Sequence, residues 1–396
     1  MRVLIGFLVA MFGAVYQSSA PVEADEILTQ LSKIRLDKRQ THSIRDITIR
    51  RDAFSITLNR GLIGFLEPVA GKVTGAVFIG SGEIVAIPPD PIEKQQVYKF
   101  TGTPILNEVF QSAIFRFTDG TYEEIQKEIS LHAEEEVTAD DMAQFDPWDE
   151  TVEVRAKLVN FRLLADFLEP QGRPLFFGEL NGDKRGWFDI VFDQRVPEEV
   201  TAFKLHDIGG TSAVDVWTSF NQRNEVRDLE LVAHENKSAI DILAYDIDAT
   251  VATGKGIDAK VTMRLKGLID GTRILNFELS PLLRVSSIST DTGESVPFYQ
   301  YPNANSSVAI LPRGLKAGQE LTLRFAYAGS VDGREPWYPS QPSRDLAMFN
   351  LNLHAPADLT MVATGDGEFP SAGFELLNRV AFADEKTVEP ILDYFS

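Results

Sequence analysis

The stretch Lys260-Val-Thr-Met-Arg-Leu265 sets the pattern for the final third of the chain, because apolar and polar residues alternate along it. A strand that buries one of its two faces shows this period of two. The alternation recurs in further segments separated by Gly, Pro, Asn or Asp: Tyr245-Asp-Ile-Asp-Ala-Thr-Val251, Ile274-Leu-Asn-Phe-Glu-Leu279, Ser307-Val-Ala-Ile-Leu311, Leu321-Thr-Leu-Arg-Phe-Ala-Tyr327 and Met348-Phe-Asn-Leu-Asn-Leu353. The region from Tyr245 to Gly367 therefore predicts an antiparallel β-sheet or sandwich with one face buried.

The preceding region also contains much strand-like sequence. Strands are expected between residues 47 and 87, where Pro88-Pro89 ends the run because proline cannot donate to a sheet. A second strand-rich block is expected over residues 152–232. Apolar spacing predicts an amphipathic helix over residues 26–36, and the polar stretch Asp37-Lys-Arg-Gln-Thr-His-Ser43 is interpreted as a linker.

Three segments between these blocks have a mixed character. Residues 105–115, which follow Pro104, and residues 122–129 are interpreted as helices or as mixtures of helix and strand. The acidic residues 134–149 indicate a solvated loop or a joint between a helix and a loop. The fold class predicted for the whole chain is mainly β: an antiparallel sandwich or saddle-like C-terminal domain preceded by a β-rich α+β N-terminal region.

The expected domain organisation has four parts. These are a signal peptide over residues 1–24, a β-rich α+β N-terminal extension over residues 25–235, a β-domain over residues 236–370 and a C-terminal tail over residues 371–396. A break near residues 140–150 would divide the extension into two subdomains. Phe65-Leu-Glu-Pro68 and Phe167-Leu-Glu-Pro170 share a tetrapeptide, which indicates either a duplicated strand–turn–strand unit or a coincidence.

The N-terminus has the features of a secretory signal. Arg2 precedes the short apolar run from Val3 to Val15, and small and polar residues follow. Cleavage is expected after Ala24, with Ala20 as the other candidate. The apolar run is shorter than the roughly 20 residues of a bilayer span, so a membrane anchor is the less favoured alternative. A secreted or periplasmic location is expected, and no transmembrane span is expected after signal cleavage.

Net charge and composition limit the classes of binding partner. The chain of 396 residues carries a formal net charge of −20, which argues against nucleic acid because phosphates require a basic surface. It also argues against binding to an anionic membrane surface. There is no cysteine, so the chain has neither a disulfide nor a thiol nucleophile.

The histidines, serines and glycines of the sequence form none of the usual catalytic motifs. None of the five histidines is four residues from another, so the His-Glu-x-x-His pattern of zinc peptidases is missing. The nearest approach is His234-Glu-Asn-Lys-Ser238, which has Ser at the second ligand position. No Gly-x-Ser-x-Gly elbow occurs, and Gly80-Ser81-Gly82 is placed in a turn between strands. No catalytic residue and no metal ligand is assigned.

Carboxylates provide the remaining candidates for chemistry. Glu67 and Glu169 could flank a glycosidic bond, and a second acidic group lies within one short segment. That group could act on glycans or hold a hard cation through oxygen ligands, but a solvated hairpin turn is the favoured interpretation because Lys184 and Arg185 interrupt it. Its members are Glu179, Asp183, Asp189 and Asp193.

An aromatic loop is the one candidate contact site. Pro336-Trp-Tyr-Pro-Ser-Gln-Pro342 places Trp337 and Tyr338 among three prolines outside any expected strand. Such rings could contact a ligand or another domain, or they could cap the sheet as a stiff corner.

One ordered set of segments resembles a known family. The set runs from Tyr245-Asp-Ile-Asp-Ala-Thr through Leu275-Asn-Phe-Glu-Leu and Val308-Ala-Ile-Leu-Pro-Arg-Gly-Leu-Lys-Ala-Gly-Gln-Glu-Leu-Thr-Leu323 to Trp337-Tyr-Pro and Phe349-Asn-Leu-Asn-Leu. It is similar to the N-terminal β-domain of M1-family zinc aminopeptidases. The upstream segments Leu58-Asn-Arg-Gly-Leu and Gly75-Ala-Val-Phe-Ile-Gly80 resemble the extension before that domain in some secreted bacterial members.

The resemblance implies the β-domain of the family without its catalytic residues. In that family the zinc ligands, the general-base Glu and the Gly-x-Met-Glu-Asn loop lie in a following domain, and none of these motifs is present here. It follows that zinc would belong to the missing domain, that this chain binds no cofactor, and that no catalytic residue can be transferred. Two hypotheses remain: the non-catalytic N-terminal portion of such a peptidase, with a catalytic peptidase domain or an envelope protein as partner, or a stand-alone protein- or glycan-binding module.

Overall fold

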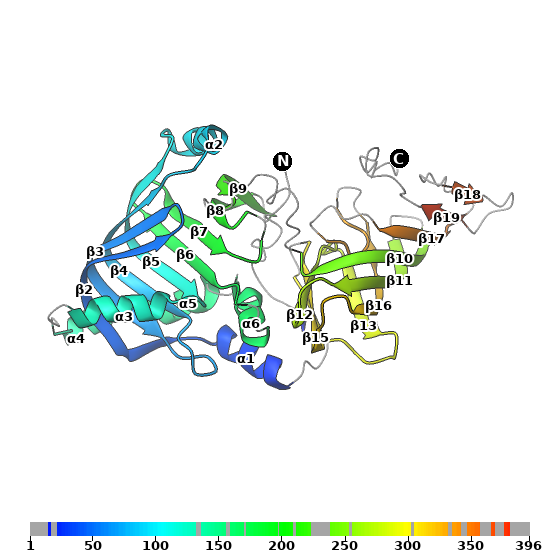
Figure 1. The fold of residues 1–396 in the computed structure, drawn as a ribbon, viewed down its shortest axis with the longest axis horizontal. Coiled ribbons are helices and arrows are strands. Elements are labelled where there is room, and N and C mark those ends of the chain that lie inside the picture. The colour runs from blue at the N-terminus through cyan, green and yellow to red at the C-terminus, as the bar shows by residue number, and fades with distance from the viewer. Residues whose placement is uncertain are drawn as a thin grey trace. The chain divides into compact units, whose positions relative to one another are not determined.

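The protein is described by a computed structural model. It describes residues 15–16, 22–131, 136–155, 159–169, 172–196, 198–208, 211–222, 238–252, 256–301, 305–331, 335–341, 347–356, 366–368 and 376–380. The chain divides into two compact units, one of residues 24–237 and one of residues 1–23 with 238–396 (Figure 1). Strands make up 54% of the described residues and helices 19%, so the mainly-β prediction is confirmed.

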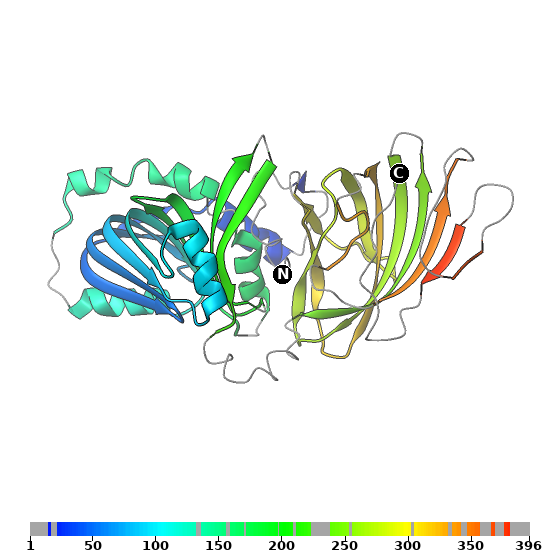
Figure 2. The same cartoon turned by 90° about the horizontal axis from the view of Figure 1, so that it is seen from above.

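The unit of residues 24–237 is built on one sheet of eight strands that follow chain order from β2 to β9, all antiparallel to their neighbours. The sheet is strongly curved (Figures 1 and 2). The strands are β2 (Leu36–Arg51), β3 (Phe54–Leu66), β4 (Gly75–Ala86), β5 (Leu106–Phe117), β6 (Leu175–Gly182), β7 (Gly186–Asp193), β8 (Val200–Ile208) and β9 (Thr211–Phe220).

Register shifts interrupt three neighbouring strand pairs of this sheet. The register shifts between Leu58 and Arg60 in β3, between Ile79 and Gly82 in β4, and again in β5. Bulges of this kind increase the local bend of a strand. The prediction that Gly80-Ser81-Gly82 forms a turn between strands is therefore wrong, because these residues lie inside β4 at its bulge.

Six helices are described in this unit: α1 (Val22–Ser32), α2 (Pro91–Thr101), α3 (Thr121–Leu131), α4 (Ala139–Ala143), α5 (Trp148–Arg155) and α6 (Asn160–Leu168). Asp90 caps α2 by accepting hydrogen bonds from the amides of Ile92 and Glu93, as expected for an aspartate at this position. The predicted helices over residues 26–36 and 122–129 correspond to α1 and α3. The acidic segment over residues 134–149 includes α4 and the start of α5.

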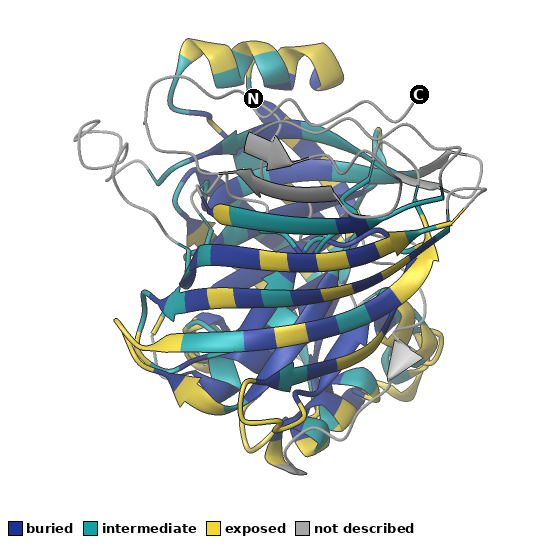
Figure 3. Ribbon diagram, turned by 90° about the vertical axis from the view of Figure 1, so that its right-hand side faces the viewer, coloured by how far each residue is buried: buried dark blue, intermediate teal, exposed yellow. Residues whose placement is uncertain are grey.

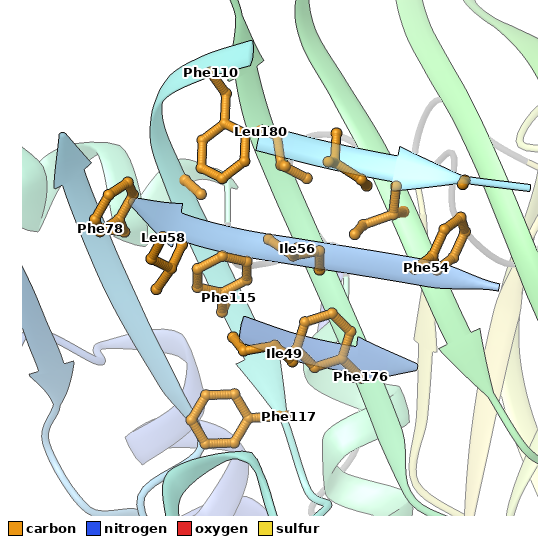
Figure 4. Packing of buried hydrophobic residues seen from close by; sticks show 14 of the residues in the cluster. Ile49, Phe54, Ile56, Leu58, Phe78, Phe110, Phe115, Phe117, Phe176 and Leu180 are labelled. Carbon is orange, nitrogen blue, oxygen red and sulfur yellow. The ribbon is translucent and has the colours of Figure 1, made fainter. Parts of the chain in front are cut away.

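The main core of this unit lies on one face of the sheet and is rich in phenylalanine. Phe54, Phe78, Phe110, Phe115 and Phe176 are all almost completely buried in it (Figure 4). Ile125 and Ile129 of α3 and Val97 of α2 complete the cluster. Helices α5 and α6 contact the other face of the sheet. Arg155 of α5 pairs with Glu179, and Arg162 of α6 pairs with Asp193. Leu180 and Phe192, the strand neighbours of these two acids, lie on the core face, so the acids lie on the opposite face.

The second unit contains two sheets. A seven-stranded sheet has the order β13-β16-β11-β10-β17-β19-β18, and a four-stranded sheet has the order β1-β14-β15-β12. Pairing is antiparallel except between β10 and β17, which run parallel. The strands are β1 (Val15–Tyr16), β10 (Ile240–Val251), β11 (Gly256–Gly267), β12 (Thr272–Phe277), β13 (Leu283–Thr290), β14 (Phe298–Gln300), β15 (Ser307–Leu315), β16 (Glu320–Ser330), β17 (Met348–His354), β18 (Asp366–Glu368) and β19 (Leu376–Val380).

The two sheets share one core, as the sandwich prediction expected. Leu275, Phe277 and Leu311 from the small sheet pack with Val261 and Phe325 from the large one. Buried and exposed residues alternate along the strands of the large sheet (Figure 3). The period of two that the sequence showed therefore reflects one face on the core and one face in solvent.

Several predictions of secondary structure are wrong. Residues 105–115 form strand β5 and not a helix, and the supposed linker over residues 37–43 is part of strand β2. The strand-rich block expected from residue 152 begins with α5 and α6, and its strands start only at Leu175.

The proposed duplication also fails, because Phe65 lies in strand β3 whereas Phe167 lies in helix α6. Strand β5 pairs directly with β6, so the sheet is continuous across the break expected near residues 140–150.

At the chain ends, most of the expected signal peptide falls outside the described residues, as does the tail except for Leu376–Val380, which forms β19. The described part of the chain contains no helix that is both long and apolar enough to cross a membrane.

Candidate functional site

The aromatic loop that the sequence singled out belongs to a cluster of four rings in the second unit. The ring of Tyr338 lies 5.3 Å from that of Tyr245 and 5.5 Å from that of Phe349, both at steep angles. Tyr245 and Phe349 stack at 4.8 Å, and Trp337 lies 5.4 Å from Tyr338. Tyr245 and Phe349 are opposite each other in the parallel pair of β10 and β17. These distances and angles are the arrangements that aromatic pairs favour.

Backbone hydrogen bonds hold the loop against the sheet. The hydroxyl of Tyr327 donates to the carbonyl of Trp337 at 2.9 Å, and the amide of Ser280 donates to the carbonyl of Pro336 at 2.8 Å. Glu278 and Ser340 exchange two backbone bonds of 2.7 and 3.0 Å. The loop over residues 335–341 is therefore an ordered part of the domain.

The rings of the loop remain accessible in part. Trp337 and Tyr338 are half-buried and pack on the edge of the core. Burial raises the pKa of the Tyr338 hydroxyl above its usual value, so the phenol is neutral at physiological pH. The cluster offers apolar ring surface and one hydroxyl, which suits contact with a protein segment or a sugar face, and it brings no nucleophile. Tyr245 and Phe349 were not predicted from the sequence to belong to this aromatic cluster, although both lie in predicted strands.

The two glutamates considered for glycan chemistry lie in different settings. Glu67 is exposed just after β3. Glu169, at the end of α6, is buried and forms an ion pair with Arg195. A residue engaged in this way is not positioned to act on a glycosidic bond.

Glu169 belongs to an ionic network that attaches α6 to the sheet. Arg162 donates from Nε and Nη2 to Asp193 at 2.8–2.9 Å and contacts Asp166 at 2.6 Å. Arg195 contacts Asp166 at 2.9 Å. The side chains of Arg162, Asp166 and Asp193 are at most 10% exposed. Burial alone would lower the pKa of Arg162, but the charges of Asp193 and Asp166 more than offset it, so the guanidinium stays charged.

The acidic segment after residue 179 is mostly buried, which corrects the solvated-hairpin interpretation. Glu179 and Asp189 are less than 5% exposed and stand opposite each other on β6 and β7. Asp193 is buried in the α6 network, and only Asp183 is exposed in the turn. Arg155, the last residue of α5, pairs with Glu179 and lies 4.1 Å from the ring centre of Trp187.

Burial and mutual repulsion change the acidity of this pair. Burial raises the pKa of Asp189 well above its usual value, the charge of Glu179 raises it further, and Arg155 lowers it in part. Burial also raises the pKa of Glu179, again partly offset by Arg155. Arg155 could not be predicted as a partner of Glu179, because 24 residues separate the two and no periodic pattern links them.

The first unit also contains a small cavity, and histidines lie in both units. A cavity of about 260 Å³ lies between β2 and α3 and is lined by charged residues that include Arg50, Glu124 and Lys127. His206 and His354 contact Asp215 and Asp248 on exposed strand faces, whereas His132 and His234 lie outside the described residues. Among the residues that the structure describes, no group of three or more His, Cys, Asp or Glu side chains could hold a metal ion.

No protein-family model and no curated protein matches the chain. Solved structures show a weak similarity. The M1 zinc metallopeptidase of Deinococcus radiodurans, crystallised as a mutant with a Tyr-Ser-Ala substrate, is 21% identical, with a TM-score of 0.31 over 35% of this chain and 38% of that one. Yeast LTA4 hydrolase in complex with bestatin is 18% identical, with a TM-score of 0.29 over 36% of this chain and 27% of that one. The chain thus spans well under half the length of either protein.

Proposed function

We propose that this chain is the non-catalytic N-terminal portion of an M1-like zinc metallopeptidase, and that its parent removes N-terminal amino acids from peptides. The support is the ordered set of segments from Tyr245 to Leu353, which resembles the entry domain of that family. In the proposed parent, zinc and the groups that polarise water lie in a following domain.

The observation that carries a binding role is the aromatic cluster in which Trp337, Tyr338 and Phe349 are partly exposed and pack around the buried Tyr245. A loop fixed by backbone bonds presents ring surface at little entropic cost, which is what contact residues require. We assign this surface to contact with the peptidase domain of the same protein or of a co-expressed partner.

The coding DNA after Ser396 tests the proposal. Reading frames that follow this codon, in phase or in the next gene, are expected to encode His-Glu-x-x-His with a downstream Glu ligand. A stop codon followed by no such motif in the neighbouring genes would overturn the proposal.

A stand-alone binding module is the second candidate, favoured by the same half-exposed rings. Rings of Trp and Tyr can stack on sugar faces or pack on apolar peptide side chains. Titration of the full chain with an oligosaccharide panel and a peptide panel would show saturable binding that Trp337→Ala weakens and that Trp148→Phe, a change in the other unit, leaves intact. If neither panel binds, this alternative is excluded for the classes tested.

A further inference from the structure

Two carboxyl groups face each other in a buried row of side chains that crosses the four strands β5 to β8. Glu179 and Asp189 are register partners on β6 and β7. Beyond them in the same row stand Ile114 on β5 and Phe203 on β8, both apolar and almost fully buried. Directly opposed residues on neighbouring strands have Cβ atoms roughly 4.5–5.5 Å apart, and like charges in this arrangement repel each other.

The charge of Arg155 acts on both carboxyl groups and lowers the pKa of each in part. Arg155 at the end of α5 pairs with Glu179, and its guanidinium lies over the ring of Trp187, the neighbour of Asp189 by two positions on β7. Trp148, the first residue of α5, contacts the same indole edge-on at 6.4 Å. Helix α5 is therefore attached to this row at both ends, by an ion pair and by ring contacts.

The hydrogen bonds do not satisfy two ionised carboxylates. Oδ1 of Asp189 and Oε2 of Glu179 are buried and have no hydrogen-bond partner among the described residues. An ionised oxygen in this position is costly without a partner. Two adjacent acids that cannot both ionise hold one proton between them and titrate as a pair.

We propose that Glu179 and Asp189 share one proton and that this proton is a switch for the docking of α5 on the sheet. With the proton present, the charges of the pair and of Arg155 sum to zero and α5 is held. When the proton leaves, a second negative charge appears in the row and the contact between α5 and the sheet weakens. This inference does not rest on the proposed function.

The direction of the pH effect follows from the raised pKa of Asp189. Burial and the charge of Glu179 raise its pKa above the value in an unfolded or opened state, so the docked state binds the proton more tightly. Its contribution to docking is complete at acidic pH and is lost as the pH rises through the folded pKa. Ile114 and Phe203 face the pair from β5 and β8 and carry no charge. The charged residue next along this face of β5 is the buried Arg116, which stands opposite Phe177 and donates to the carbonyl of Thr74.

Hydrogen–deuterium exchange of the full chain, followed in the peptide that covers residues 148–155, tests the switch. After correction for intrinsic exchange, protection of α5 should be greatest at acidic pH and fall as the pH rises through the raised pKa of the pair, with a limiting slope of about tenfold per pH unit for one proton. Asp189→Asn, which imitates the protonated acid, should remove this dependence. Asp183→Asn on the exposed turn of the same hairpin should keep it.

A second measurement keeps the test decisive if Asp189→Asn does not fold. The infrared spectrum of the wild-type chain at neutral pH should contain the carbonyl band of a buried protonated carboxyl group, which disappears on titration to alkaline pH. A pH-independent protection of α5, or an Asp189→Asn variant with the wild-type pH profile, would overturn the proposal. A neutral-pH spectrum without the protonated carboxyl band would overturn it as well.

Discussion

At Gly61 and Gly80, two neighbouring strands approach so closely that no side chain fits. The two residues are register partners on β3 and β4. A Cβ atom on Gly80 would lie 2.3 Å from the carbonyl oxygen of Arg60, and Gly80 has φ of +153°. Both the contact and the backbone conformation exclude an L side chain. The sequence showed glycines here but could not distinguish a bulge from a turn, since both use glycine.

Replacement of Gly80 by Ala should therefore lower the free energy of unfolding by about 2–3 kcal/mol, because the backbone of β4 must shift to relieve the overlap. Urea denaturation measures the change. Gly120→Ala is the matched control, since the nearest atom to its added Cβ is 4.0 Å away, and it should stay within about 0.5 kcal/mol of the wild type. Equal stability of the two variants would refute the close-approach account.

At the scale of the element, buried ionic groups fix where helix α6 lies. Arg162 joins α6 to Asp193 on β7, and Arg195 joins the following turn to Asp166 and Glu169. Pairings over such separations leave no periodic signal in a sequence. Strand β5 was not predicted either, because both of its faces are buried. Phe115 is buried on the core face and Ile114 on the other, so the alternation expected of a strand disappears. The first part of strand β2, before Ile47, was missed for the opposite reason, because Lys38 and Arg39 on this edge strand are exposed.

Arg162→Met should lower the free energy of unfolding by about 3–5 kcal/mol, because Asp193 and Asp166 would be left buried without their cation. Lys38→Met provides the control. It breaks an ion pair whose side chains are 57% and 64% exposed, and such pairs contribute about 0–1 kcal/mol. Chemical denaturation followed by circular dichroism compares the two. A loss for Arg162→Met no larger than that for Lys38→Met would show that the network does not hold α6.

At the scale of the whole molecule, each of the two units has a core of its own in the part of the chain that the structure describes. One is centred on the curved sheet of β2 to β9, and the other lies between the two sheets of the C-terminal unit. The sequence predicted the second well, because its strands expose one face and so alternate. It predicted the first less well, because helices and strands of that unit bury both faces of the sheet.

Matched leucine substitutions should separate the two cores. Leu180→Ala and Leu323→Ala each remove a completely buried side chain, one from each core, and each should lower stability by about 2–5 kcal/mol. Hydrogen–deuterium exchange should show faster opening of residues 36–220 for the first variant and of residues 240–330 for the second. Equal loss of protection in both regions for either variant would contradict two independent cores.

The central claim is that a zinc peptidase domain accompanies this chain in the proposed parent protein. Capture of the native protein from the envelope and secreted fractions of its own cells, with an antibody against residues 238–356, tests it directly. The account predicts that the captured material contains zinc and removes N-terminal amino acids from peptides, and that a chelator abolishes this activity. The captured species should be heavier than the 44.0 kDa of this chain, or should be a complex that contains it. A captured species of 44.0 kDa or less, without zinc and without peptidase activity, would contradict the claim.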